Sequence, residues 1–254
     1  MTISWAASCV DGVVVASDSM WVHKDRTPGA VYSGALSEHK LGMVAGRFAY
    51  AISGVFDGAL GISPSFGAMA ALDDVAAAMF RELAGRQLPQ FPREDGELSE
   101  DDEFGLLIGG GRAGSRPEVL SLRSNPQRVV RVPIGGIVDG ALLGYGDPEP
   151  LQLHGPDLTV ADAIAIGARR SLEYCRHLYR ACGLEHLEDF RGLFGEKGQP
   201  IPPAAFPLQI AVITANTMRR FEAYAPDEDD LRAVLGASRP RGRHRGTIAV
   251  GVGA

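Results

Sequence analysis

The chain has 254 residues, of which 45% are hydrophobic and 22% are charged, a balance typical of a globular protein with a sizeable core. The formal net charge of −6 gives no reason to expect nucleic acid as a main partner. No apolar run reaches the roughly 18 residues that a membrane span needs, and the first residues lack the pattern of a signal peptide.

The cysteine pattern predicts a reducing compartment. The three cysteines, Cys9, Cys175 and Cys182, are odd in number and form no CxxC motif. This argues against a disulfide framework and against a zinc site, and the six histidines show no metal-ligand spacing. We therefore expect a cytoplasmic protein that uses no metal and no cofactor.

The first third of the chain begins with short apolar runs separated by turns. Two apolar runs on either side of Asp11-Gly12 predict a hairpin that starts at the N-terminus, because a D-G pair in that position is a strong hairpin signal. A polar loop is expected over 22–38. A second pair of strands is expected over 41–45 and 48–53.

Helical and strand patterns then follow each other to the end of the chain. Residues 66–86 and 160–182 are predicted helices, and Thr159 with Asp162 is typical of the start of the second one. A short helix is expected over 227–236. The further predicted strands are 103–109, 117–122, 127–133, 137–143, 207–214 and 218–224. Strand runs separated by helices predict an α+β fold, in which helices cover antiparallel sheets.

A single domain is expected over residues 1–238, because no repeat, low-complexity tract or linker interrupts this part of the chain. Residues 239–254 form a basic and then apolar tail. We interpret its arginines as solvated charges, and Thr247–Val250 reads either as an added strand or as a loose end.

Three residues whose side chains are candidates for catalysis stand at predicted strand ends. Thr2 follows the initiator Met, Asp18 closes the second strand, and Lys40 opens the next one. Singly, they read as an ordinary second residue, a turn residue and a surface charge. The chain nevertheless has only three lysines against many arginines, and a lysine is a compact charge with a tunable pKa, which an arginine is not.

Together these positions resemble the opening of the proteasome β-subunit-like family of N-terminal nucleophile hydrolases and its bacterial relatives. That family has a mature N-terminal Thr, an Asp sixteen residues later and a Lys at the third strand, which Thr2, Asp18 and Lys40 match. It also has a small residue and a Gly after the fourth strand, matched by Ser53-Gly54, with Asp57 shortly after. The resemblance is specific in the first sixty residues.

The resemblance implies a four-layer αββα sandwich and a threonine-type endopeptidase. By this analogy the Thr2 hydroxyl is the nucleophile once Met1 is removed, and its free α-amine, with a pKa of about 7.7–8.0, is the base. Lys40 stabilises the developing alkoxide and Asp18 holds Lys40 in place. The Gly54 N–H donates to the oxyanion.

The resemblance also implies a peptide or unfolded-protein substrate and a homo-oligomeric ring or spiral, with an ATPase or regulatory partner left open. Two positions depart from the family. Tyr145 stands where the family has a Ser in a Gly-x-Gly turn, and residues 176–180 lack an expected Asp and Ser. Two other functions therefore stay open, a non-catalytic ring or scaffold subunit and an N-terminal nucleophile amidase acting on a small amide.

Overall fold

The computed structural model describes residues 2–24, 32–36, 40–56, 70–89, 97–98, 103–125, 127–139, 151–181, 208–223 and 250–251. Within these residues strands predominate, and the strand pairings are antiparallel. Two helices accompany them in this part of the chain.

The larger sheet, sheet A, has the strand order β11-β10-β1-β2-β12-β13-β14. Its strands are β1 (Ser4–Ser8), β2 (Val13–Ser17), β10 (Gly136–Asp139), β11 (Leu151–Leu153), β12 (Leu208–Ile213), β13 (Met218–Ala223) and β14 (Val250–Gly251). β1 and β2 form the predicted N-terminal hairpin, with Ser4 opposite Ser17 and Ser8 opposite Val13. The hairpin lies in the middle of the sheet, so both of its strands are buried.

The second sheet, sheet C, has the strand order β5-β6-β7-β8-β9. Its strands are β5 (Leu41–Val44), β6 (Phe48–Ser53), β7 (Gly105–Gly110), β8 (Glu118–Ser124) and β9 (Gln127–Val132). Each strand pairs with its neighbour in the chain, as a run of hairpins does. The predicted pair over 41–45 and 48–53 is confirmed.

A separate two-stranded ribbon contradicts the loop predicted over 22–38. β3 (Met20–Lys24) pairs with β4 (Tyr32–Leu36), with Trp21 opposite Ala35. Trp21 and Val22 in β3 and Tyr32 in β4 favour an extended backbone, and the polar residues between the two segments obscured this pattern. The three-residue strand β11 was also missed, because so short a segment shows no alternation.

The two helices are α1 (Leu72–Ala84) and α2 (Val160–Ala181). α1 begins later than the predicted residue 66, although residues 66–69 lie outside the described part of the chain. α2 begins as predicted, because the Thr159 hydroxyl accepts the Asp162 N–H at 3.2 Å. The Asp11 carboxylate accepts the Val160 N–H at 2.8 Å, so the β1–β2 turn also caps this helix.

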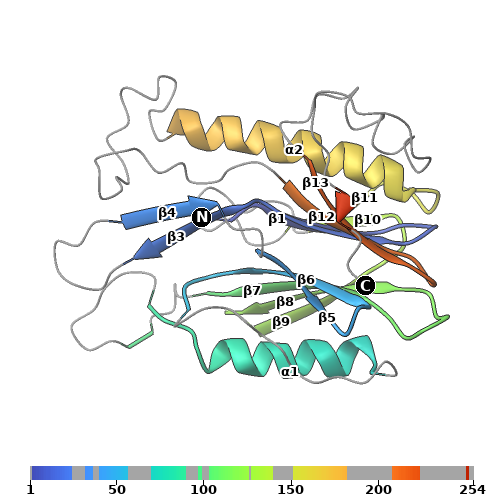
Figure 1. The fold of residues 1–254 in the computed structure, drawn as a ribbon, viewed down its shortest axis with the longest axis horizontal. Coiled ribbons are helices and arrows are strands. Elements are labelled where there is room, and N and C mark those ends of the chain that lie inside the picture. The colour runs from blue at the N-terminus through green and yellow to red at the C-terminus, as the bar shows by residue number, and fades with distance from the viewer. Residues whose placement is uncertain are drawn as a thin grey trace.

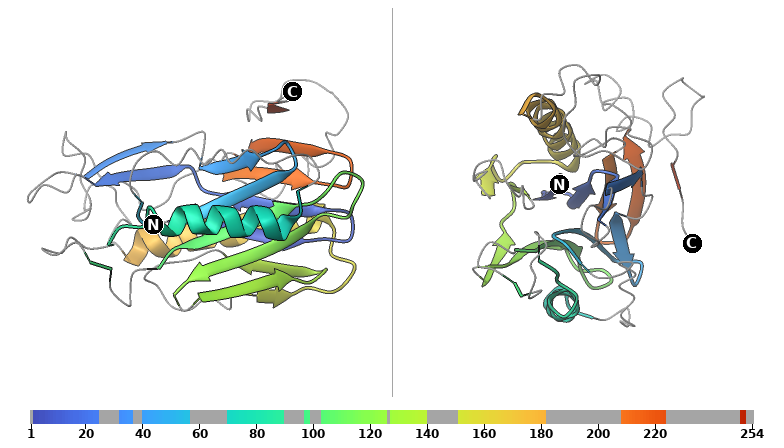
Figure 2. Two further views of the ribbon diagram at one scale, coloured as in Figure 1. Left: turned by 90° about the horizontal axis from the view of Figure 1, so that it is seen from below. Right: turned by 90° about the vertical axis from the view of Figure 1, so that its left-hand side faces the viewer.

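Three apolar clusters define how the layers pack. Between the sheets lie residues such as Ala6 and Val15 of sheet A and Leu107 of sheet C. On the outer face of sheet A, α2 packs through Ile164, and on the outer face of sheet C, α1 packs through Met79. Figures 1 and 2 show the two helices on opposite outer faces of the paired sheets. Antiparallel sheets accompanied by helices are thus confirmed.

Some predictions fall on residues that the structure does not describe. The short helix over 227–236 and most of the tail over 239–254 lie outside the described residues, apart from β14, which pairs with β13. In the described part of the chain, neither helix combines the length and apolar character that a membrane crossing requires.

Candidate functional site

A buried ion pair joins the two sheets where β2 ends and β5 begins. Lys40 Nζ lies 2.6 Å from Asp18 Oδ1, and the two side chains are only 4% and 1% exposed. Asp18 follows a strand of sheet A and Lys40 precedes a strand of sheet C. Because removing both charges from water is costly, such a pair persists only when its geometry offsets the desolvation. The fold therefore brings together two of the four predicted site residues.

The same carboxylate holds the start of the chain. The Ile3 N–H donates to Asp18 Oδ1 at 3.0 Å, and the Asp18 N–H donates to the Ile3 carbonyl at 2.8 Å. Lys40 Nζ and the Ile3 nitrogen thus share one oxygen and lie within two hydrogen-bond lengths of each other. Thr2 is half-buried and directly precedes Ile3, so its backbone lies beside the ion pair.

Gly54, the fourth predicted residue, stands just after β6 with a backbone φ of +128°. This conformation favours glycine, and a Cβ at this position would lie 2.7 Å from the Cβ of Phe104. The backbone therefore accounts for a glycine here. Its role as an N–H donor stays a prediction, and Asp57, which follows it, lies outside the described residues.

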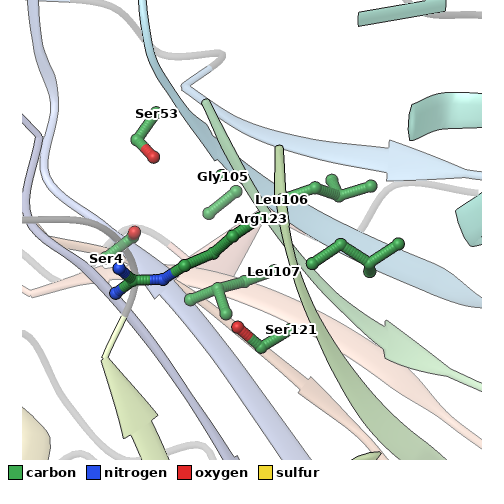
Figure 3. A pocket seen from close by; sticks show the side chains of 9 residues that line it. Ser4, Ser53, Gly105, Leu106, Leu107, Ser121 and Arg123 are labelled. Atoms are coloured by element: carbon green, nitrogen blue, oxygen red, sulfur yellow. The ribbon is translucent and has the colours of Figure 1, made fainter. Parts of the chain in front are cut away.

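A narrow hollow, too small to hold a water molecule, lies between the sheets and has a partly polar lining. Its polar side chains come from three strands, β1, β6 and β8, and are Ser4, Ser53, Ser121 and Arg123. Figure 3 shows the Arg123 guanidinium pointing towards Ser4, and Arg123 Nη1 lies 3.5 Å from Glu103 Oε1. Sequence reasoning missed this hollow. The signal for it was serine at inward-facing positions of otherwise apolar strands.

One serine beside the hollow is buried without a partner. Ser17 lies opposite Ser4 on the neighbouring strand, and among the described residues its hydroxyl has no hydrogen-bond partner. Buried hydroxyls are usually paired, so this end of the space between the sheets is unusually polar. It lies on the side of β1 and β2 that faces sheet C, at the Thr2 end of the hairpin.

Another ion pair, which the sequence did not predict, lies on the other face of sheet A. Arg170 of α2 pairs with Asp139, which stands opposite Trp5 in the sheet register. Burial raises the pKa of Asp139, and the Arg170 guanidinium opposes this change. The pair ties α2 to the strand that neighbours β1.

The structure does not describe the positions where the chain departs from the family pattern. Tyr145 and the side chains of residues 176–180 lie outside the described part. In the part that is described, no group of three or more His, Cys, Asp and Glu side chains is arranged to hold a metal ion.

Comparisons with known proteins show a shared fold. No model of a protein family and no curated protein matches the chain. This chain is similar to the solved structure of the helical assembly of the Anbu complex from Pseudomonas aeruginosa, with a TM-score of 0.52 and 15% sequence identity over 93% of both chains. Anbu from Yersinia bercovieri, described as an ancestral beta-subunit, has a TM-score of 0.49 and 15% identity, over 96% of this chain and 100% of that chain. Anbu from Hyphomicrobium sp. strain MC1 has a TM-score of 0.46 and 13% identity, over 93% of this chain and 94% of that chain.

The expectation that this chain is a member of the proteasome β-subunit-like family is wrong. No family model matches it, and the Anbu structure from Pseudomonas aeruginosa, at 15% identity, shows a shared fold and no more. The pattern that suggested the family is a hairpin with polar residues at its strand ends. Such a pattern reflects the local geometry of a sheet, and it does not by itself show that a chain belongs to a family.

Proposed function

We propose that the chain is an N-terminal threonine hydrolase, an endopeptidase that cleaves peptide bonds with Thr2 after removal of Met1. The observation that supports this function best is the buried Asp18–Lys40 pair beside Thr2. A cation that is desolvated and held by a carboxylate stabilises negative charge on a nearby oxygen far more than a solvated cation does. A threonine hydroxyl needs this help, since it is a weak nucleophile on its own.

The proposed reaction begins when the Thr2 hydroxyl attacks the carbonyl carbon of a peptide bond and its proton passes to the free α-amine of Thr2. Lys40 stabilises the charge on the attacking oxygen, and the Gly54 N–H donates to the oxyanion. The carbon–nitrogen bond then breaks, and the leaving nitrogen takes the proton from the α-amine. Water hydrolyses the resulting ester, which releases the acid and restores the Thr2 hydroxyl.

The arrangement of the layers supports a finer statement about the fold. We propose that α2, sheet A, sheet C and α1 form the four-layer αββα sandwich of N-terminal nucleophile hydrolases, within a domain over 1–238 and a tail over 239–254. The three clusters that separate these layers support it. The proposed substrate is a peptide or unfolded protein, and the proposed assembly is a homo-oligomeric ring or spiral. The Pseudomonas aeruginosa protein, which is described as a helical assembly, supports the latter.

The test is covalent labelling with a peptide epoxyketone, which forms a ring with both the hydroxyl and the free α-amine of an N-terminal threonine. We expect intact-mass spectrometry to show loss of Met1 and a gain of one inhibitor mass. Thr2→Val, which replaces the hydroxyl by a methyl group of similar size, should give no adduct. Thr217→Val, which removes a hydroxyl from the exposed β12–β13 turn, is the matched control and should be labelled fully.

Each other outcome favours a different function. A retained Met1 with no adduct contradicts the hydrolase and leaves a non-catalytic scaffold subunit. Labelling by the epoxyketone without cleavage of any peptide in a fluorogenic panel, together with hydrolysis of small amides, favours the amidase.

A further inference from the structure

Gln209 is a fully buried amide near the start of β12, next to the Asp18–Lys40 pair. Its flanking residues are Leu208 and Ile210, and its partner in the sheet register is Ser17. A glutamine in such an apolar strand is uncommon, because a buried amide is costly unless its hydrogen bonds are made. Its contacts therefore indicate what it does.

The side-chain oxygen of Gln209, a residue of sheet A, makes a hydrogen bond to sheet C. It accepts the backbone N–H of Leu41 at 2.8 Å. Leu41 is the first residue of β5 and directly follows Lys40, and β5 is an edge strand of sheet C. An edge strand has N–H groups without a neighbouring strand, and Gln209 supplies the acceptor for this one.

The other end of the amide contacts the residue that follows Asp18. Gln209 Nε2 donates to the Ser19 hydroxyl at 3.1 Å. Its oxygen also accepts Arg220 Nη2 at 3.1 Å. A backbone N–H and a guanidinium can only donate, so the amide has one possible orientation. Gln209 therefore binds Ser19, which follows Asp18, and Leu41, which follows Lys40, at the same time.

We propose that Gln209 is a positioning residue that sets the placement of Lys40 relative to Asp18. The two charges come from different sheets, and the contacts of Gln209 link the end of β2 to the start of β5 at that point. Its catalytic consequence rests on the proposed function, because it acts through Lys40 on Thr2. Its structural consequence, the placement of the Lys40 ammonium, can be measured without any activity.

The test observes Lys40 directly by NMR of protein labelled with ¹³C at the lysine ε-carbon. The chain has only three lysines, Lys24, Lys40 and Lys197, so Lys24→Arg and Lys197→Arg assign the third resonance. In Gln209→Met, which keeps the length of the side chain but none of the hydrogen bonds, we expect the Lys40 resonance to shift or split. In Gln209→Glu, which keeps the acceptor for Leu41, it should stay single.

Two further variants make the test specific. Arg47→Met removes contacts to the Gly111 and Ala215 carbonyls at the opposite end of β5, and it should leave the Lys40 resonance unchanged. Ser19→Ala removes the contact to Gln209 Nε2 and leaves the Gln209 side chain in place. It is the milder variant should Gln209→Met not fold, and it should shift the Lys40 resonance in the same direction. An unchanged Lys40 resonance in the folded Gln209→Met, or in Ser19→Ala if Gln209→Met does not fold, overturns the proposal.

Epoxyketone labelling separates this proposal from the proposed function. If both hold, the labelling rate of Gln209→Met falls on the order of 10²-fold, as a small misplacement of a catalytic group does, and Gln209→Glu recovers part of it. A shifted Lys40 resonance in a protein whose native form is never labelled supports the positioning role and contradicts the hydrolase. A native labelling rate in Gln209→Met contradicts the positioning role in catalysis.

Discussion

Several of the buried polar side chains that the structure describes join segments that are distant in the chain. The carboxylate of Asp18 accepts both the Lys40 ammonium and the Ile3 N–H, and the buried amide oxygen of Gln209 accepts the Leu41 N–H. Removing one partner of such a contact leaves a buried donor or charge without compensation, which costs about 3–5 kcal/mol for an ion pair. Variants of Lys40 therefore test the fold as much as the chemistry, and Thr2 is the better position for testing activity.

Cys9 gives a prediction at this level, because its thiol is buried close to the Asp11 turn. Burial raises the pKa of Cys9 from 9.0 to about 12, with a further increase from the charge of Asp11. Only the thiolate reacts with iodoacetamide. We therefore expect Cys9 to stay unmodified at pH 8.5 in the native protein, and its reaction rate to keep rising up to about pH 12. Peptide mapping by mass spectrometry measures this.

The protein unfolded in guanidinium chloride is the control for Cys9. There the thiol returns to its ordinary pKa and should react quickly at pH 8.5. If native Cys9 reacts at the same rate as unfolded Cys9, the β1–β2 turn is open in solution, and the assignment of this thiol to the core is wrong.

The secondary-structure elements meet through close backbone contacts as well as through large side chains. α2 crosses sheet A with Gly167 directly over the indole ring of Trp5. The Trp5 indole N–H donates to the Ser171 hydroxyl at 3.2 Å, and this hydroxyl donates to the Gly167 carbonyl at 2.8 Å. One glycine, one tryptophan and one serine thus set the distance and the orientation of the helix over the sheet.

Gly167→Ala tests this contact. A Cβ at this position would lie 2.3 Å from Cζ2 of Trp5, so the helix must move away from the sheet. We expect the free energy of unfolding to fall by about 1–3 kcal/mol, because overpacking outweighs the helix propensity of alanine. Urea denaturation followed by circular dichroism measures the change.

Gly85→Ala, at the end of α1, is the matched control. Gly85 has an ordinary φ of −71°, and its added Cβ would come no closer than 3.6 Å to other atoms. Alanine should be neutral there or stabilise by up to about 1 kcal/mol. Equal effects of the two substitutions would mean that α2 does not rest on Trp5.

For the molecule as a whole, the contact between the two sheets is the decisive feature. The middle of the space between them is filled by small and β-branched residues, and Gly109 of β7 lies against Val15 of β2. Towards the Thr2 end the lining becomes polar, with serines, Arg123 and the Asp18–Lys40 pair. The apolar part holds the layers together, and the polar part gives the molecule its candidate site.

A double-mutant cycle across the sheets tests this arrangement. A Cβ on Gly109 would lie 2.8 Å from Cγ2 of Val15, so Gly109→Ala should destabilise the protein through overpacking. Val15→Ala should also destabilise it, through a cavity. In the double variant each change relieves the other, and the loss should be smaller than the sum by about 0.5–3 kcal/mol.

Val129→Ala combined with Gly109→Ala is the control cycle. Val129 lies on β9 of the same sheet as Gly109 and is exposed, so these two effects should add. Additivity in the Val15 cycle as well would show that the sheets do not touch at this point.

Much of the local structure was predictable from the chain alone. The D-G pair between apolar runs predicted the first hairpin, and Thr159 with Asp162 predicted the start of α2, because turns and caps depend on residues that are close in sequence. The ribbon of β3 and β4 and the short β11 were missed, since their patterns are brief and interrupted.

The candidate site depended on contacts that no local pattern contains. Thr2, Asp18 and Lys40 were identified through a resemblance, and the family that this resemblance suggested is wrong, yet the pairing of Asp18 with Lys40 is present. Gln209 lies 190 residues from Ser19 and 168 from Leu41. Spacing along a strand or helix follows from its own backbone geometry, whereas the residues that meet between two sheets depend on how those sheets are stacked. That stacking brought Asp18, Lys40 and Gln209 together.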